Sequence, residues 1–232
     1  MSLKLLAIDT STEACSAALM VQDQILERYQ CVPRAHTQLI LPMMQALLDE
    51  AGLKLRDLDA LAFTRGPGSF TGIRIAASIV QASAFAAELP VVLVSSLQCL
   101  AQTTYRELQA QQVWVAIDAH LGEVFSAAYR LQPETGLMQA CSAEQLALPQ
   151  HCLASGLTNF VGVGSGWDRY ADRFGTQFKN QLQQWFPQRY PKATDAVVIA
   201  AQAFQQGATV TAGDALPTYL RETVALRRGC DG

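Results

Sequence analysis

The chain has 232 residues, of which half are hydrophobic and 16% are charged, and its net charge is -3. A chain of this length buries roughly 70% of its unfolded surface, which is enough for one large or two small domains. The net charge argues against nucleic-acid binding by the chain alone, because phosphate binding depends on clustered lysine and arginine. The alternative is that nucleic acid binds to a local basic patch of Arg221, Arg227 and Arg228 near the C-terminus.

The cysteine spacing and the N-terminus indicate a reducing compartment. None of the six cysteines belongs to a Cys-x-x-Cys pair, and residues 1–8 lead into a strand-like run without the layout of a signal peptide. The longest apolar segment, 73–89, is interrupted by polar residues and is not expected to span a membrane. We therefore expect a cytoplasmic protein without a membrane association.

Residues 3–8, 14–21 and 25–31 predict three strands joined by tight turns. The first strand ends in Asp9-Thr10-Ser11-Thr12, which resembles the first phosphate loop of the actin, Hsp70 and sugar-kinase superfamily. The residues alone favour an ordinary turn, because Asp, Ser and Thr commonly satisfy a turn's own backbone. No glycine follows Asp9 to ease the approach of a phosphate.

Two helices with wide apolar faces are predicted at 37–51 and 73–89. Their apolar arcs are wider than a helix needs to cover one sheet. The pattern leaves two alternatives open, which are a surface that pairs with another protein and an entirely internal core. His36, at the start of the first helix, is expected to be a cap or interface residue.

A glycine-rich loop links the strand 58–63 to the second helix, and it reads Arg65-Gly66-Pro67-Gly68-Ser69-Phe70-Thr71-Gly72. Its glycines permit a positive φ or a close backbone approach, and Ser69 and Thr71 are candidate helix caps. The spacing fits neither the P-loop nor the dinucleotide-binding fingerprint. The glycine spacing is at least as compatible with a tight turn, which lets the helix pack closely, as with an anion-binding site.

The segment 65–74, Arg-Gly-Pro-Gly-Ser-Phe-Thr-Gly-Ile-Arg, resembles the signature of the TsaB (YeaZ) family of bacterial tRNA-modification subunits. The runs at 33–38 and 217–221 match the same family, and the matching pieces cover most of the chain. The resemblance implies an α/β fold of two actin-like (ribonuclease H-like) domains, with mixed sheets flanked by helices. It places the first domain at 1–105, completed by a C-terminal helix at 195–226, and a smaller second domain at 106–194. The residues themselves predict an apolar helix over 195–206 that ends at Gly207.

A weak internal repeat agrees with such a duplication. Leu-Ala-Ile-Asp ends at Asp9, and Val-Ala-Ile-Asp ends at Asp118. By resemblance, Asp118 and Gly122 correspond to a second phosphate loop, and Gly164 and Gly166 to an adenosine-binding turn. By resemblance, the vestigial nucleotide-binding residues are Asp9, Thr10, Ser11, Thr12, Asp118, Gly122, Gly164 and Gly166. We expect at most weak binding of ATP or ADP there, and no cofactor in the chain itself.

Two further segments give local predictions. Ser142 and Gln145 have the spacing of a capping box and predict a short helix over 141–148. Residues 174–192 are aromatic and glutamine-rich and predict irregular surface.

A catalytic relative of the family, the TsaD-type subunit, carries two metal-binding histidines four residues apart. The matching positions here are Ser96 and Leu100. Leu100 cannot ligate a metal and Ser96 is a poor substitute for imidazole. We therefore expect no metal site.

The resemblance implies a non-catalytic subunit of the complex that transfers threonylcarbamoyl from threonylcarbamoyl-adenylate to tRNA. The acceptor is N6 of the adenosine next to the anticodon, in tRNAs that read codons beginning with A. The implied partners are a TsaD-type catalytic subunit and a TsaE-type ATPase, with tRNA bound only through the complex and a homodimer in isolation. The expected partner surface comprises His36, Thr37, Leu39, Ile40, Met43, Met44, Leu47, Arg74, Ala77, Gln81 and Ala84.

Two other functions compete with this one. An ATP-dependent phosphotransferase of the actin-like superfamily would need intact phosphate loops, in which glycines are sparse here. A glycoprotease-like peptidase is less compatible, because His36, His120 and His151 share no metal-ligand spacing and no His-Glu-x-x-His occurs.

Overall fold

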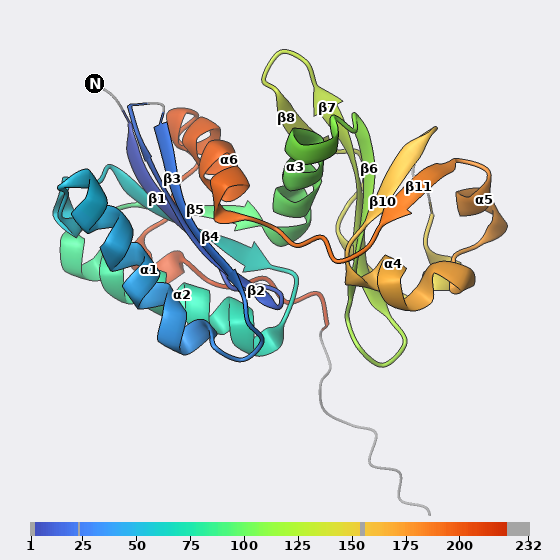
Figure 1. Cartoon of the computed structure of the whole chain (residues 1–232), viewed down its shortest axis with the longest axis horizontal. Helices are drawn as coiled ribbons and strands as arrows, with labels where there is room; N and C mark the ends of the chain where they lie inside the picture. Colours follow the sequence, from blue (N-terminus) through green and yellow to red (C-terminus); the bar gives the residue numbers. More distant parts are fainter. Residues whose placement is uncertain (1–2, 23, 154–155, 222–232) are drawn as a thin grey trace, which may run out of the picture.

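The computed structural model describes residues 3–22, 24–153 and 156–221 (Figure 1). The strands are β1 (Lys4–Asp9), β2 (Ala14–Val21), β3 (Gln24–Cys31), β4 (Ala60–Gly66), β5 (Val91–Ser95), β6 (Gln112–Asp118), β7 (Val124–Gln132), β8 (Leu137–Ala140), β9 (Gln145–Ala147), β10 (Phe160–Val163) and β11 (Leu182–Phe186). The α-helices are α1 (His36–Ala51), α2 (Phe70–Ala87), α3 (Ser96–Leu108), α4 (Ser165–Tyr170), α5 (Thr176–Lys179) and α6 (Ala193–Gln205).

The first unit is a five-stranded mixed sheet in the order β3-β2-β1-β4-β5. The strands β1, β2 and β3 are antiparallel, whereas β4 and β5 run parallel to β1. Apolar residues point to both faces of the central strands, so both faces need a cover. Helices α1 and α2 cover one face and α6 covers the other (Figure 1).

The second unit repeats this arrangement, in the order β11-β10-β6-β7-β8, with β9 paired to β7. Strands β1 and β6 occupy equivalent central places, and each ends on the aspartate of the repeated Ile-Asp pair. The internal repeat in the sequence therefore reflects two structurally equivalent units. The predicted class, two mixed sheets flanked by helices, is confirmed.

An aromatic core holds the second sheet against α4 and α5. Trp114 makes edge contacts with Trp167, Phe174 and Phe178, at ring-centroid distances of 5.5, 5.2 and 4.6 Å. All four side chains are at most 3% exposed. The prediction of irregular surface over 174–192 is wrong at these positions, because Phe174 and Phe178 are core residues.

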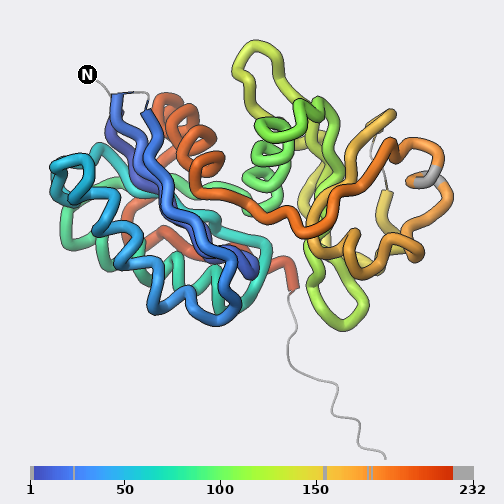
Figure 2. The backbone as a smooth tube through the Cα atoms, in the orientation of Figure 1, coloured from blue at the N-terminus to red at the C-terminus, as the bar shows by residue number. Residues whose placement is uncertain are grey.

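Helices α3 and α6 lie between the two sheets (Figures 1 and 2). Leu97 and Leu100 of α3 pack with Val115 and Val163 of the second sheet. The expected boundary at 105/106 therefore falls inside a helix that contributes to the core of the second unit.

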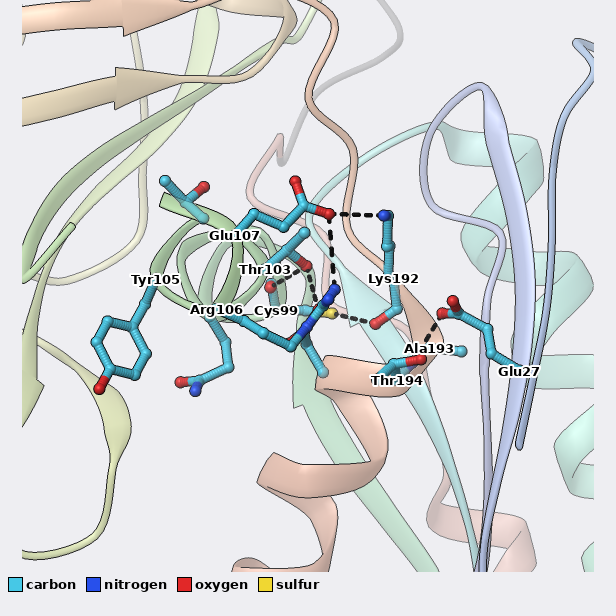
Figure 3. A network of polar contacts seen from close by, with 12 residues as sticks. Glu27, Cys99, Thr103, Tyr105, Arg106, Glu107, Lys192, Ala193 and Thr194 are labelled. Atoms are coloured by element: carbon cyan, nitrogen blue, oxygen red, sulfur yellow. Dashed lines mark hydrogen bonds and ion pairs between the residues drawn. The ribbon is translucent and has the colours of Figure 1, made fainter. Parts of the chain in front are cut away.

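Polar contacts tie the end of α3 to the start of α6 (Figure 3). The carboxylate of Asp195, 2% exposed, accepts from Arg106 Nε and Nη2 at 2.9 Å each and from Thr103 Oγ1 at 2.7 Å. Glu107 binds Lys192 Nζ at 2.6 Å and also pairs with Arg189. These contacts fix α6 of the first unit against α3.

Two predicted helices differ from the structure. The predicted C-terminal helix at 195–226 is α6, which ends at Gln205, and the chain then returns along the first unit, where Val210 forms a bridge with Val91. Residues 222–226, Arg227 and Arg228 lie outside the described residues. The predicted helix at 141–148 is wrong, because this segment includes β9.

Helix α2 is long and apolar enough, by length and composition alone, to cross a membrane. In this fold one side of the helix packs on the first sheet, since Ile73, Ala76 and Val80 are at most 2% exposed and Ala76 and Val80 pack in the same cluster as Phe63 of β4. The apolar residues of α2 therefore pack against the first sheet.

Candidate functional site

The glycine-rich loop packs directly on the turn that follows β1. A Cβ on Gly68 would overlap the carbonyl oxygen of Ser11, and a Cβ on Gly72 would overlap that of Thr10. Gly66 alone among these three has a positive φ, of 105°. Of the two alternatives for these glycines, close approach therefore applies to Gly68.

Hydrogen bonds join the same two segments. Ser69 N donates to Ser11 O at 2.8 Å, and Thr10 Oγ1 donates to Gly72 O at 2.7 Å. The Ser69 hydroxyl accepts from Gly72 N at 3.3 Å, so Ser69 is the N-cap of α2, as predicted. The start of α2 thus packs on the turn at 9–12, and these hydrogen bonds join the two segments.

Asp9 is fully buried beneath this contact. Its carboxylate accepts from Ser11 N at 3.2 Å and from Ser11 Oγ at 2.9 Å. Burial raises the pKa of Asp9 to about 6, against the opposing effect of the Thr64 and Ser11 hydroxyls. Asp9 therefore acts as an internal acceptor that holds the turn.

The second predicted phosphate loop is closed by a cation from the protein. Asp118 Oδ2 accepts from Arg169 Nη1 at 2.7 Å, and Oδ1 accepts from Tyr170 OH at 3.1 Å and His120 N at 2.9 Å. Gly122 lies in the same turn with a φ of 83°. The guanidinium of Arg169, whose side chain is 60% exposed, balances the charge of this carboxylate.

Gly164 and Gly166 permit close packing. A Cβ on Gly166 would lie 2.9 Å from Ala116 O, and a Cβ on Gly164 would come closer still to the same oxygen. The side chain of Leu100 lies 3.3 Å from that position on Gly164. The glycines therefore allow α4 to approach β6 closely.

The positions that match the metal ligands of the catalytic relative are both internal. Ser96 and Leu100 are fully buried, and Leu100 belongs to the core that α3 shares with the second sheet. Among residues 3–22, 24–153 and 156–221, no group of three or more His, Cys, Asp or Glu side chains could hold a metal ion.

Two adjoining cavities separate the units on the side of these turns. The first, of about 540 Å³, is lined by residues that include Ser11, Thr12, His36, Asp118 and Ser165. The second, of about 750 Å³, is lined by residues that include Phe70, Arg74, Phe125, Tyr219 and Arg221. The fold thus brings Thr12 and Asp118 to one cleft, whereas Asp9, Gly164 and Gly166 do not line it.

The helix pair α1–α2 has an exposed outer side that differs from the one predicted. Six members of the expected partner surface are core residues, at most 6% exposed: Ile40, Met43, Met44, Leu47, Ala77 and Ala84. His36 is also buried, and its Nε2 lies 3.1 Å from Ala14 O. These predictions are wrong for the isolated chain, because the wide apolar arcs pack between the helices and the sheet.

The remaining members of the predicted surface reach solvent. Thr37 and Arg74 are exposed, and Leu39 and Gln81 are half-buried. Leu41, Phe70 and Phe85 add exposed apolar area, with Phe85 80% exposed. A groove of about 390 Å³ between α1 and α2 includes Thr37 and Phe70 in its lining. Sequence reasoning missed Leu41 and Phe85, although each stands apart from the buried positions of its helix.

Comparisons with known proteins agree with the resemblance of the glycine-rich segment. Residues 20–227 match the family model described as TsaD: tRNA N6-adenosine threonylcarbamoyltransferase. The chain is 41% identical to the tRNA threonylcarbamoyladenosine biosynthesis protein TsaB of Escherichia coli, over 97% of this chain and 98% of the relative. Its identity to the Haemophilus influenzae protein of the same name is 37%, over 98% and 97% of the two chains.

A solved structure supports the same assignment. YeaZ from Pseudomonas aeruginosa is 42% identical and superposes with a TM-score of 0.87, over 94% of this chain and all of that one. The chain therefore belongs to the TsaB (YeaZ) family.

Proposed function

We propose that the chain is a non-catalytic subunit of the complex that forms threonylcarbamoyladenosine in tRNA. The observation that carries this proposal is that groups of the protein itself satisfy Asp9 and Asp118, the aspartates of the two turns at which the actin-like superfamily holds phosphate and metal. The start of α2 covers the turn at 9–12, and Arg169 neutralises Asp118. Such a chain contributes to the reaction by binding other subunits.

The reaction follows from the family. The complex transfers threonylcarbamoyl from threonylcarbamoyl-adenylate to N6 of the adenosine next to the anticodon, in tRNAs that read codons beginning with A. A TsaD-type subunit supplies the catalytic residues and a TsaE-type ATPase completes the complex. The chain works in the cytoplasm, and tRNA binds only through the complex, in agreement with the net charge of -3.

The partner surface is the outer side of α1 and α2. It combines Leu41 (53% exposed), Phe70 (50%) and Phe85 (80%) with the cationic side chain of Arg74. Exposed apolar patches of this kind mark interfaces, and a specific interface buries roughly 1,600 Å² in total. The isolated chain pairs with a second copy through this surface, and a TsaD-type partner competes for it.

A phosphotransferase role has one supporting observation, the 540 Å³ cavity between the two vestigial loops. It would require Asp118 to release Arg169 before a metal could bind. Weak ATP or ADP binding is compatible with this cavity, whereas hydrolysis is not expected. The peptidase alternative has less support, because Cys15 and Cys99 are buried, and burial raises the pKa of Cys15 to about 12 and also raises the pKa of Cys99.

The experiment is co-purification with a TsaD-type protein, followed by a tRNA-modification assay. Phe85→Glu places a charge on the proposed surface and should abolish both partner binding and modification. The matched control is Leu121→Glu, at an apolar side chain of similar exposure (84%) in the β6–β7 turn. A Phe85→Glu protein that binds the partner and supports full modification would show that the surface is assigned wrongly.

A further inference from the structure

The last described residues, Pro217–Arg221, cross from the first unit to the second, and we call this segment the strap. Figure 2 shows this part of the chain (red) crossing the first unit behind its strands and ending near the second unit. On the way, Ala215 is fully buried in the core that α1 and α2 share with the first sheet. The strap is therefore fixed at its start by packing with the first unit.

Two arginines of the glycine-rich segment hold the strap on the first unit. Thr218 N donates to Arg65 O at 2.8 Å, and Arg65 Nη1 donates to Thr218 Oγ1 at 2.6 Å. Arg74 Nε donates to Tyr219 OH at 2.8 Å. The guanidinium of Arg74 also lies 3.6 Å from the ring centre of Phe70, which in turn lies 5.9 Å from the ring of Tyr219.

The other end of the strap binds the β6–β7 turn of the second unit. Arg221 Nη2 donates to Glu123 Oε2 at 2.6 Å and to Ala119 O at 3.1 Å. Both side chains of the ion pair are largely screened from solvent, at 22% and 31% exposure. A partly buried pair with a second hydrogen bond stabilises more than an exposed pair does.

Between its two anchors the strap lines the 750 Å³ cavity, through Thr218, Tyr219, Leu220 and Arg221. Phe70 of the first unit and Phe125 of the second lie on the same cavity. The distance between the first unit at Phe70 and the second unit at Phe125 is what we call the width of the cleft. The contacts between α3 and α6 join the units elsewhere, through Asp195 and Arg106.

We propose that Pro217–Arg221 is an interdomain strap that holds the cleft at its present width, through Arg65 and Arg74 of the first unit at one end and through the pair of Arg221 with Glu123 of the second unit at the other. Release of either end lets the β6–β7 turn move away from the start of α2. The signature segment at 65–74 and the tail motif at 217–221 are thus two halves of one contact. This inference concerns the isolated chain and does not depend on the proposed partner.

Hydrogen exchange of the full chain tests the strap. The readout is the exchange rate of amides in the β6–β7 turn, where Ala119 N donates to Glu123 O and Glu123 N donates to His120 O. Arg221→Met should raise that rate by about tenfold, because it removes the ion pair and the bond to Ala119. Amides of β1 and β4 should exchange as in the wild type, which distinguishes cleft opening from global unfolding.

The decisive variant is the double change Thr218→Val and Tyr219→Ala, which removes side-chain contacts only at the first unit. If the contacts at the first unit also restrain the other end of the strap, amide exchange in the turn at 119–123 rises several-fold in this variant. Neither of the two altered side chains is hydrogen-bonded to that turn. The matched control is Arg28→Met, which breaks an ion pair with Glu50 inside the first unit. Wild-type exchange in the turn for the double variant would overturn the inference.

Discussion

Replacing Asp9 with asparagine should stabilise the protein at neutral pH, because the wild type buries a carboxylate completely. The pKa of Asp9 rises from 3.8 to about 6 on folding. The two values differ by about 2, and each pKa unit corresponds to about 1.36 kcal/mol, so the ionised carboxylate costs about 3 kcal/mol of folding free energy. Asparagine keeps the shape and an acceptor for Ser11 N without the charge.

The sign of the pH dependence follows from the raised pKa. Below pH 3.8 Asp9 is protonated in both states and carries no penalty, and the penalty develops as the pH rises towards 6. The stability difference between Asp9→Asn and the wild type should therefore grow by about 3 kcal/mol between about pH 4 and 6.5 and stay constant above.

The assay is urea unfolding of both proteins at a series of pH values, followed by far-ultraviolet circular dichroism. The difference in unfolding free energy isolates Asp9 from the other titrating groups. A difference that does not depend on pH, or one that favours the wild type at pH 7, would refute the burial of an ionisable Asp9 under the start of α2.

Three other changes probe the packing and the interdomain contacts. Gly72→Ala should lower the unfolding free energy by roughly 1–3 kcal/mol, because the new Cβ overlaps Thr10 O; thermal melting checks this, and Gly213→Ala, with no atom nearer than 3.9 Å, is the control. Ala77→Glu should lower the unfolding free energy by about 4 kcal/mol or more, because it buries a charge in the core. This variant should therefore lose partner binding because it unfolds, and not as a folded monomer. Arg106→Met should cost about 2–3 kcal/mol, since it leaves the buried Asp195 carboxylate without its cation; Arg28→Met, at an exposed pair, should cost under about 1 kcal/mol in the same denaturant titration.

Local patterns in the sequence were sufficient for the central strands. The run at 3–8 and the repeated Ile-Asp pair predict β1 and β6, because buried central strands are short, apolar and end at turn residues. The Ser69 cap of α2 was also predictable, since an N-cap uses a side chain and an amide three residues apart.

Contacts between distant segments were not predictable from such patterns. Ile40 and Met43 point into the space between helix and sheet, but a wide apolar arc is equally compatible with a partner surface. The capping-box spacing at Ser142 was misleading, because its hydroxyl accepts from Ala128 N of the neighbouring strand at 3.0 Å. The pairing of Arg169 with Asp118 joins residues 51 positions apart, and no local signal marks it.

The C-terminal region shows the limit of an inference from family resemblance. Gly207, with a φ of 75°, follows the end of α6 and marks a stop that the residues themselves indicate. The longer helix was expected only from the resemblance. Beyond Gly207 the chain returns along the first unit and forms the strap, a course that depends on Arg65, Arg74 and Glu123 rather than on local propensity.

The central claim is that the chain supports threonylcarbamoyl transfer without contributing a catalytic group. The most direct measurement is the rate of tRNA modification by the reconstituted complex at saturating subunit concentrations, with Asp9→Asn or Asp118→Asn in this chain. Both variants should sustain the wild-type rate once assembly is confirmed by sedimentation. An assembled complex that loses its turnover with either variant would contradict the account.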